Sequence, residues 1–402
     1  MSPQLRFPKF TDEWQLEKLG DFAKFSKGTN ISKDDIDENG AVEAIRYGEL
    51  YTMYNETIEE IKSRTNLMPS SLVFSKKNDV IIPASGETHI DIATASCVLK
   101  DNVALSGDIN IIRSENNGVF LAYYFNNKKK VDIARLAQGV SVVHLYGSNL
   151  KDLMLNLPSK PEQEKIADFL SAVDERIGQG ERKLELLRQY KKGVMQQIFS
   201  REVRFRDENC NDYPEWEEKS LSQLSDRVTT KNRDSEISFV LTNSATKGVV
   251  SQTEYFDKDI ANKDNLSNYY VVSVDDFVYN PRISVHAPVG PIKRNHVSQG
   301  VMSPLYAVFR SKSGSVDFFE QYFETKYWHD YLKGVANYGV RHDRMNITTT
   351  DLYSMPIPFP VLSEQQKITG FLLALDDKIK AEEIRLISTR AWKKGLLQEM
   401  FA

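Results

Sequence analysis

The sequence contains two copies of one segment, and this repeat constrains the fold more than any other feature. Residues 162–199 align without gaps onto residues 364–401, and 17 of these 38 positions are identical. Both copies begin E-Q-x-K-I, at Glu162 and Glu364, and both end on phenylalanine, at Phe199 and Phe401. Identity at this level indicates an internal duplication. We therefore expect two related halves with a pseudo-two-fold repeat.

The front of each half repeats as well. An R-F dipeptide, a tryptophan, a leucine and a late proline recur in the same order, with four extra residues in the second half: Arg6-Phe7, Trp14, Leu19 and Pro158, then Arg204-Phe205, Trp216, Leu221 and Pro360. Residues 25–145 and 227–345 show no convincing similarity to each other. We predict one scaffold that carries two different inserts, and we expect specificity to reside in the inserts.

The repeated segments read as long amphipathic helices. Apolar residues recur at spacings of three and four, which places them on one stripe of a helix. A helix of 38 residues is about 57 Å long, and one such stripe alone would leave apolar surface in water. We expect the two helices to pack on each other as an antiparallel, coiled-coil-like pair. The interface residues predicted from the pattern are Ile166, Leu170, Val173, Ile177, Leu184, Leu187, Ile368, Leu372, Leu375, Ile379, Leu386 and Leu396.

The helix stripe has polar interruptions. Gly180 and Glu382 fall at one core position of the pattern, and Lys191 and Lys393 fall at another. Two separate amphipathic helices, each on its own domain, are the alternative interpretation. The duplication favours the pair.

Each insert alternates short β-rich runs with turn-forming residues and ends in a helical stretch. The first has runs at 72–74, 80–83, 98–99, 103–105 and 109–112 and a helix over 120–135; the second has runs at 269–274, 277–279 and 305–309 and a helix near 317–332. We predict α+β recognition domains with curved, mixed sheets at 1–158 and 201–360. The helices would occupy 159–200 and 361–402.

Composition limits the classes of protein to consider. A chain of 402 residues with 41% apolar and 27% charged residues suggests two or three globular domains, and no apolar run is long enough for a membrane span. Two distant cysteines and no secretory signal favour a cytoplasmic protein without a disulfide framework. The net charge of −4 gives no hint of nucleic-acid binding, so any anion-binding surface must be local.

Motifs of catalysis are mostly missing. The sequence has no phosphate-binding G-x-x-x-x-G-K-[ST] loop and no dinucleotide fingerprint. Asn280-Pro281-Arg282 only faintly resembles the N-P-P-[FY] tetrad of adenine methyltransferases, and Asp212 with Glu217-Glu-Lys219 only weakly resembles a nuclease motif. The six histidines lack metal-ligand spacing. We predict a non-catalytic chain that binds no cofactor or metal.

Polar clusters in the inserts suit DNA contact instead. Arginine and lysine bond guanine, asparagine and glutamine bond adenine, and neighbouring cations hold phosphates. A solvated loop explains any single cluster about as well. The candidate residues are Ser85, Thr88, His89, Lys128, Lys129, Gln138, Ser141, His144 and Tyr146 in the first domain, and Asn280, Arg282, Ser284, His286, Lys293, Arg294, Tyr338, Arg341, His342 and Arg344 in the second.

Together these motifs resemble the DNA-specificity subunit of Type I restriction–modification enzymes. The resemblance rests on W-x-x-x-x-L-[GS] at Trp14, G-x-S-V-x-H-L-Y at Gly139, L-P-x-x-x-E-Q-E-K-I-A-x-F-L at Leu157 and the second copy L-S-E-Q-Q-K-I at Leu362. It covers the whole chain. In the second copy Gly339-Val-Arg-His stands where the first has G-x-S-V-x-H.

The resemblance implies that each recognition domain reads one half of a bipartite site in double-stranded DNA. Because the inserts differ, the site would be asymmetric. The helices would act as a ruler for the spacer, since about 57 Å corresponds to about 17 base pairs. The implied partners are two modification subunits, with S-adenosylmethionine and adenine N6-methylation, and restriction subunits with ATP and Mg²⁺.

Two other classes of function are possible from the residues alone. A scaffold or adaptor that displays two protein-binding domains would explain the helices, but it gives no reason for unlike inserts in one frame. A duplicated nuclease or methyltransferase would need motifs that the sequence lacks.

Overall fold

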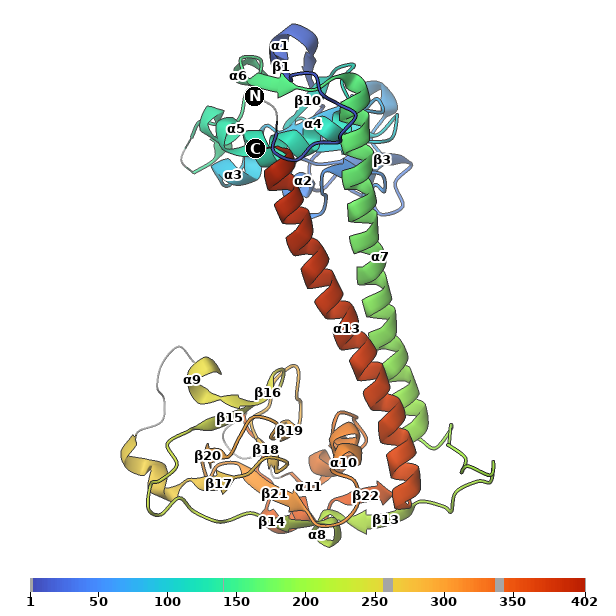
Figure 1. The fold of residues 1–402 in the computed structure, drawn as a ribbon, viewed down its shortest axis with the longest axis vertical. Helices are drawn as coiled ribbons and strands as arrows, with labels where there is room; N and C mark the ends of the chain where they lie inside the picture. Colours follow the sequence, from blue (N-terminus) through green and yellow to red (C-terminus); the bar gives the residue numbers. More distant parts are fainter. Residues whose placement is uncertain (1–2, 140, 256–262, 337–342, 402) are drawn as a thin grey trace. The chain divides into compact units, whose positions relative to one another are not determined.

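The computed structural model describes residues 3–139, 141–255, 263–336 and 343–401. The chain divides into two compact units: unit 1 comprises Met1–Arg182 and Glu383–Ala402, and unit 2 comprises Lys183–Glu382. The long helices α7 (Lys160–Phe199) and α13 (Leu362–Met400) therefore each contribute one segment to each unit (Figure 1). No helix in the described part of the chain has the length and apolar character needed to cross a membrane.

Unit 1 is built around a mixed sheet with the strand order β2-β10-β6-β8-β4, beside a smaller sheet β5-β3-β9 and the pairs β1-β12 and β7-β11. Its strands are β1 Gln15–Lys18, β2 Lys24–Lys27, β3 Val42–Ile45, β4 Thr57–Ile58, β5 Ser63–Thr65, β6 Asp79–Pro83, β7 Ser85–Gly86, β8 Ser96–Val98, β9 Ala104–Leu105, β10 Ile109–Arg113, β11 Val143–His144 and β12 Met154–Leu157. Its shorter helices are α1 Leu19–Phe22, α2 Glu49–Thr52, η1 Pro69–Ser71, α3 His89–Ile92, α4 Gly118–Tyr124, η2 Phe125–Lys129, α5 Lys130–Leu136 and α6 Gly147–Leu150.

Unit 2 repeats this plan with a four-stranded sheet, β14-β21-β18-β19, and the pairs β13-β22, β15-β16 and β17-β20. Its strands are β13 Glu217–Ser220, β14 Ser225–Arg227, β15 Leu241–Ser244, β16 Gly248–Ser251, β17 Tyr270–Val272, β18 Phe277–Tyr279, β19 Ile292–Arg294, β20 Gly300–Met302, β21 Ala307–Ser311 and β22 Pro356–Phe359. Its shorter helices are α8 Leu221–Leu224, α9 Gln252–Tyr255, η3 Lys263–Asn268, α10 Val316–Phe323, α11 His329–Val335 and α12 Thr349–Tyr353.

The α+β class predicted from the sequence is confirmed, and the mixed sheet is confirmed in unit 1, whereas the described pairs of the four-stranded sheet in unit 2 are all antiparallel. The run 72–74 is not a strand, because only Phe74 bridges, to Ala104. The helix expected over 120–135 contains a π-helical turn, η2. The helix expected near 317–332 is broken into α10 and α11. At this break Thr325 Oγ1 donates to Tyr322 O and Trp328 Nε1 donates to Phe323 O, and these bonds stabilise a turn in place of a continuous helix.

The helices are antiparallel within each unit. In unit 1, Asp174 pairs with Lys393 at 2.6 Å, and the later residue Glu181 pairs with the earlier residue Arg390. In unit 2, Lys183 pairs with Glu382 at 3.0 Å and Lys191 pairs with Asp376 at 2.6 Å. The lysines that interrupt the apolar stripe thus make ion pairs at equivalent places in the two units, since Lys191 and Asp174 each recur 202 positions later.

The residues predicted for the helix interface lie at different depths. Ile166, Leu170, Val173, Ile368, Leu372, Leu375 and Leu386 are buried, while Ile177, Leu184, Leu187, Ile379 and Leu396 are half-buried. Leu397, which the pattern did not select, is buried in the core of unit 1 with Met400 and Phe401.

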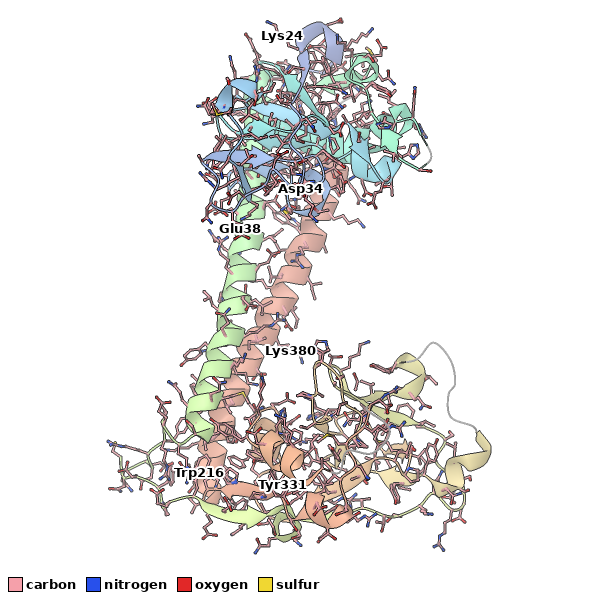
Figure 2. The ribbon with its side chains drawn as sticks, turned by 180° about the vertical axis from the view of Figure 1, so that it is seen from behind. Lys24, Asp34, Glu38, Trp216, Tyr331 and Lys380 are labelled. Atoms are coloured by element: carbon pink, nitrogen blue, oxygen red, sulfur yellow. The ribbon has the colours of Figure 1, made fainter. Side chains whose placement is uncertain are left out.

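The duplicated E-Q pair joins each helix start to its unit. Glu162 accepts two hydrogen bonds from Arg6, at 2.6 and 2.7 Å. Glu364 accepts bonds from Arg204 at 3.2 and 3.0 Å and also from Trp216 Nε1 at 2.9 Å. Figure 2 labels Trp216 beside the start of α13. A carboxylate that is buried is stable only when it is paired in this way.

The next glutamine of the motif holds the neighbouring helix. Gln163 accepts a hydrogen bond from Asn117 N, at the N-cap of α4, and donates to Pro158 O. Gln365 accepts one from Ser315 N, at the N-cap of α10, and donates to Pro360 O. These equivalent bonds explain why the motif appears once in each half.

A second repeated contact lies where each helix ends. Phe401 packs against Phe120 and Tyr124 in unit 1, and Phe199 packs against Phe318 and Tyr322 in unit 2. Two backbone hydrogen bonds of 3.1 Å accompany these contacts, from Leu5 N to Glu399 O and from Val203 N to Gln197 O. The first bond joins opposite ends of the sequence, and the second closes a local turn.

Candidate nucleic-acid interface

Each unit carries a short antiparallel ribbon at the same place in its fold. The ribbon joins the segment that follows a buried strand, β6 or β18, to the segment that precedes a short helix, α6 or α12. Most of the candidate residues that the structure brings together lie on these ribbons.

In unit 1 the ribbon is β7 paired with β11, and Ser85 lies opposite His144. Ser85 Oγ and His144 Nδ1 are 3.1 Å apart, so the two side chains bond to each other. His144 also exchanges two backbone hydrogen bonds with Gln138, of 2.7 and 2.8 Å. The sequence-predicted residues Ser85, Gln138 and His144 therefore form one cluster.

The turn between Gln138 and β11 explains the glycine of the G-x-S-V-x-H motif. Gly139 has φ of +118°, and a Cβ there would lie 2.1 Å from Val142 O, so only glycine fits. Ser141 is exposed in this turn. Tyr146 is 45% exposed, its ring stacks at 6.4 Å from that of His144, and Lys27 Nζ lies 5.9 Å from the ring centre.

The remaining candidates of unit 1 have structural uses or stand alone. Thr88 caps α3, since its Oγ1 accepts a bond from Asp91 N. His89 is exposed at the start of that helix. Lys128 is exposed on η2, whereas Lys129 pairs with Asp132 at 3.2 Å.

In unit 2 the ribbon places Arg282 opposite Arg344. Ile283 N donates to Asp343 O at 3.0 Å, and Met345 N donates to Pro281 O at 2.8 Å. These bonds flank the two arginines, which makes them a non-hydrogen-bonded pair, the type in which opposing side chains lie closest. Two like charges therefore face each other.

The ribbon of unit 2 borders a groove of about 340 Å³. Asn280, Arg282, Ser284 and Arg344 all line it. Asn280 holds the backbone that leads into the ribbon, because its Oδ1 accepts a bond from Arg282 N and its Nδ2 donates to Asn243 O. The described residues that line the groove include two arginines and no carboxylate, although residues 201–360 carry a net charge of −3.

Lys293 and Arg294 lie apart from this groove and are already paired. Lys293 pairs with Glu324, and Arg294 pairs with Asp317 at 2.6 Å and with Asp275 at 2.6 Å. The bonds to Asp317 and Glu324 hold β19 against α10 and its C-terminal end, and the bond to Asp275 holds β19 against the turn before β18. His286 is exposed on the loop between β18 and β19. Tyr338, Arg341 and His342 lie outside the described residues.

Sequence reasoning missed Gln321 of α10 and two further residues whose polar atoms are buried without a partner among the described residues. One is Asn243 in the groove wall, where Nδ2 donates to Val278 O and Pro291 O and Oδ1 is left unbonded. The other is Arg46, after β3 in unit 1, whose Nε is unbonded. No sequence signal marks them, because a lone Asn or Arg at a strand end has many explanations.

Among the described residues, no three His, Cys, Asp or Glu side chains gather to hold a metal ion. The ribbons offer guanidinium, imidazole, hydroxyl and carboxamide groups, which can bond phosphates and base edges.

Comparison with known proteins gives concordant results. The family model described as "Type I restriction modification DNA specificity domain" matches residues 11–188 and again 214–389. A Methanocaldococcus jannaschii protein described as the type I restriction enzyme MjaX specificity subunit is 25% identical over 92% of this chain and 88% of its own length. The type I restriction enzyme MjaVIII specificity subunit of that organism is 25% identical over 55% of this chain and 51% of its own.

Solved structures share the fold. The S subunit of a Type I restriction–modification system from M. genitalium matches with a TM-score of 0.59 at 16% identity, over 100% of this chain and 99% of that one. The HsdS subunit from Thermoanaerobacter tengcongensis matches with a TM-score of 0.51 at 17% identity, over 98% and 96%.

Proposed function

The chain belongs to the Type I restriction–modification DNA specificity family, and from this premise we propose that it is the subunit that selects the DNA sequence. The observation that carries the proposal is the double match of the family model, once on each half. It disfavours an unrelated adaptor. Residues 1–158 and 201–360 would each read one half of an asymmetric bipartite site, and helices 159–200 and 361–402 would set the spacer.

The two ribbons support a separate reading by each unit. The ribbon of unit 1 presents Ser85, His144 and nearby Tyr146, whereas that of unit 2 presents Arg282 and Arg344. Side chains of different hydrogen-bonding character prefer different base edges and backbone groups. The remaining candidate residues stay proposed contacts.

The partners of this function are also proposals. We expect two modification subunits that hold S-adenosylmethionine and methylate adenine N6, and restriction subunits that use ATP and Mg²⁺, all in the cytoplasm where the DNA lies. The chain itself would contribute recognition and no catalysis.

Methylation mapping tests the proposal. Co-expression with its modification subunit should produce adenine methylation in one new two-part motif. His144→Ala and Arg341→Ala should then alter different halves of that motif. No new bipartite motif would refute the function, and a change of both halves by each variant would refute the separate reading.

A further inference from the structure

The groove of unit 2 holds two positive charges that face each other across a ribbon, and we propose that Arg282 and Arg344 together bind one backbone phosphate of the target DNA. This inference rests on the proposed function. It assigns to the pair a positioning role, which is distinct from reading bases.

The geometry of the ribbon places the two side chains opposite each other on one face of the ribbon. The backbone bonds on either side of Arg282 and Arg344 define a non-hydrogen-bonded pair, in which Cα atoms are about 4.5 Å apart. Like charges directly opposite each other destabilise a strand pair. The free protein therefore carries an unfavourable contact that a shared anion would remove.

Acidic groups of the protein neutralise the charges of Arg282 and Arg344 only in part. Among the described residues, Arg282 has no ion-pair or side-chain hydrogen-bond partner. The carboxylate nearest to Arg344 is that of Asp343, at 3.8 Å from Nε, which is too long for a hydrogen bond. Arg294 of the same unit shows the contrast, because two carboxylates bond it at 2.6 Å.

The surroundings favour an anion over a base edge. The described lining of the groove has no carboxylate, and Asp343, outside that lining, is the one described acid paired with either arginine. Guanidinium groups bond phosphate oxygens in bidentate geometry. A neutral guanine would leave the repulsion between the two cations, whereas a phosphate offsets it with a full negative charge.

The equivalent ribbon of unit 1 has no facing arginines, and this difference supports the assignment. Ser85 and His144 occupy the opposing positions there and satisfy each other with a direct bond. Because these two side chains already bond to each other, neither needs an anion as a partner. The phosphate site is therefore specific to unit 2.

The test uses the full chain in complex with its modification subunit and a duplex that carries the methylated motif. The double variant Arg282→Ala/Arg344→Ala should bind about tenfold more weakly at 50 mM salt. The slope of log K against log salt should fall by about 0.9, the value for one phosphate. Base preference at every position of the motif should stay the same.

A scan with single methylphosphonate linkages, which remove one phosphate charge at a time, locates the contact. The wild-type complex should lose affinity at one linkage in the half-site of unit 2, and the double variant should show no loss at that linkage. If the double variant lost affinity at the same linkage as the wild type, the proposal would be overturned. A slope change of about 1.8 would show two separate phosphates, and a relaxed base preference at one position would show base reading; either result overturns it.

Two controls keep the outcomes distinct. Arg206→Ala removes one positive charge from an exposed ion pair outside the groove and should leave the slope unchanged. Without DNA the double variant should melt at the same temperature or higher, because it removes a repulsion; a clear fall would mean that the pair is structural. Failure of the wild-type complex to prefer motif DNA would refute the proposed function itself.

Discussion

The two units place the same contacts around their helix starts but present different chemistry on their ribbons. The shared contacts at the helix starts, here called the frame, include the ion pair Arg6–Glu162 in unit 1 and the equivalent pair Arg204–Glu364 in unit 2. On the ribbons, a serine–histidine pair in unit 1 corresponds to an arginine–arginine pair in unit 2. The frame is repeated because each unit must bind the same helices, and under the proposed function the ribbons are free to differ because each would contact a different half-site.

The frame is not fully symmetric, and its differences are small enough to measure. Glu364 has a donor, Trp216 Nε1, that Glu162 lacks. In unit 1, Trp14 Nε1 has no partner among the described residues. Variants at equivalent positions can therefore show whether the two sets of contacts contribute equally to the free energy of unfolding.

The largest effect is expected from removal of the frame carboxylates. Glu162→Ala leaves the partly buried Arg6 without its carboxylate, which costs about 3–5 kcal/mol. Glu364→Ala leaves Trp216 Nε1 without its acceptor, but Arg204 keeps Glu215 at 3.0 Å, so we expect a loss of similar size. Urea unfolding followed by tryptophan fluorescence measures both. Glu115→Ala, at an exposed pair with Lys160, is the control and should change stability little; equal, small losses at all three sites would contradict the assignment.

The two frame tryptophans should respond unequally to loss of the indole N–H. Trp216→Phe removes a hydrogen bond to a charged, buried acceptor, worth about 1.5–3 kcal/mol. Trp14→Phe removes a donor that has no partner, and its penalty should be smaller by about that amount. Thermal unfolding of the two variants gives the comparison, and equal losses would show that Trp14 is bonded in solution.

The helix ion pairs should show a smaller difference. Asp376→Asn leaves Lys191, whose side chain is 15% exposed, without its carboxylate. Asp174→Asn leaves Lys393 with a second carboxylate, Glu56, at 3.7 Å. We expect a loss of about 1–2 kcal/mol for Asp376→Asn and less for Asp174→Asn. Chemical denaturation decides the order, and the reverse order would mean that the bond from Tyr123 to Asp174 dominates.

The smallest expected effect concerns the two cysteines, of which each unit contains one. Cys97 is buried, and burial raises the pKa of its thiol to about 12, whereas Cys210 is exposed. At pH 8 a thiol reagent should modify one cysteine rapidly in the native protein and two in denaturant. Because the unfolded thiol ionises near pH 8.5, unit 1 should lose stability as the pH rises above that value. Rapid modification of both cysteines would show that unit 1 opens readily.

Much of the frame could be predicted from sequence, because duplication marks it. The helices and the special status of Glu162, Gln163 and Phe199 follow from positions that recur 202 residues later, and the antiparallel pairing follows from the domain between the helices, which must return the chain. The partners of Lys191 and Lys393 could not be predicted, since a lysine on an apolar stripe looks like an interruption until the opposing aspartate is in place.

The ribbons were only partly predictable. The clusters around His144 and Arg282 were found by residue type, but the pairing of Arg282 with Arg344 depends on backbone register. Lys293 and Arg294 looked equally suited to DNA, yet their charges are matched by acids from α10 and the turn before β18. Charge pairing of this kind depends on tertiary structure, which composition does not report.

The bond between Leu5 and Glu399 has a consequence for the order of folding during synthesis. Unit 2 is one continuous stretch of chain, so its core can close as soon as residue 382 has left the ribosome. Unit 1 needs Leu397, Met400 and Phe401 for its core, although its globular part is made first. Contacts between distant residues also carry a larger entropic cost of closure. The first unit to be translated is therefore the last to be completed.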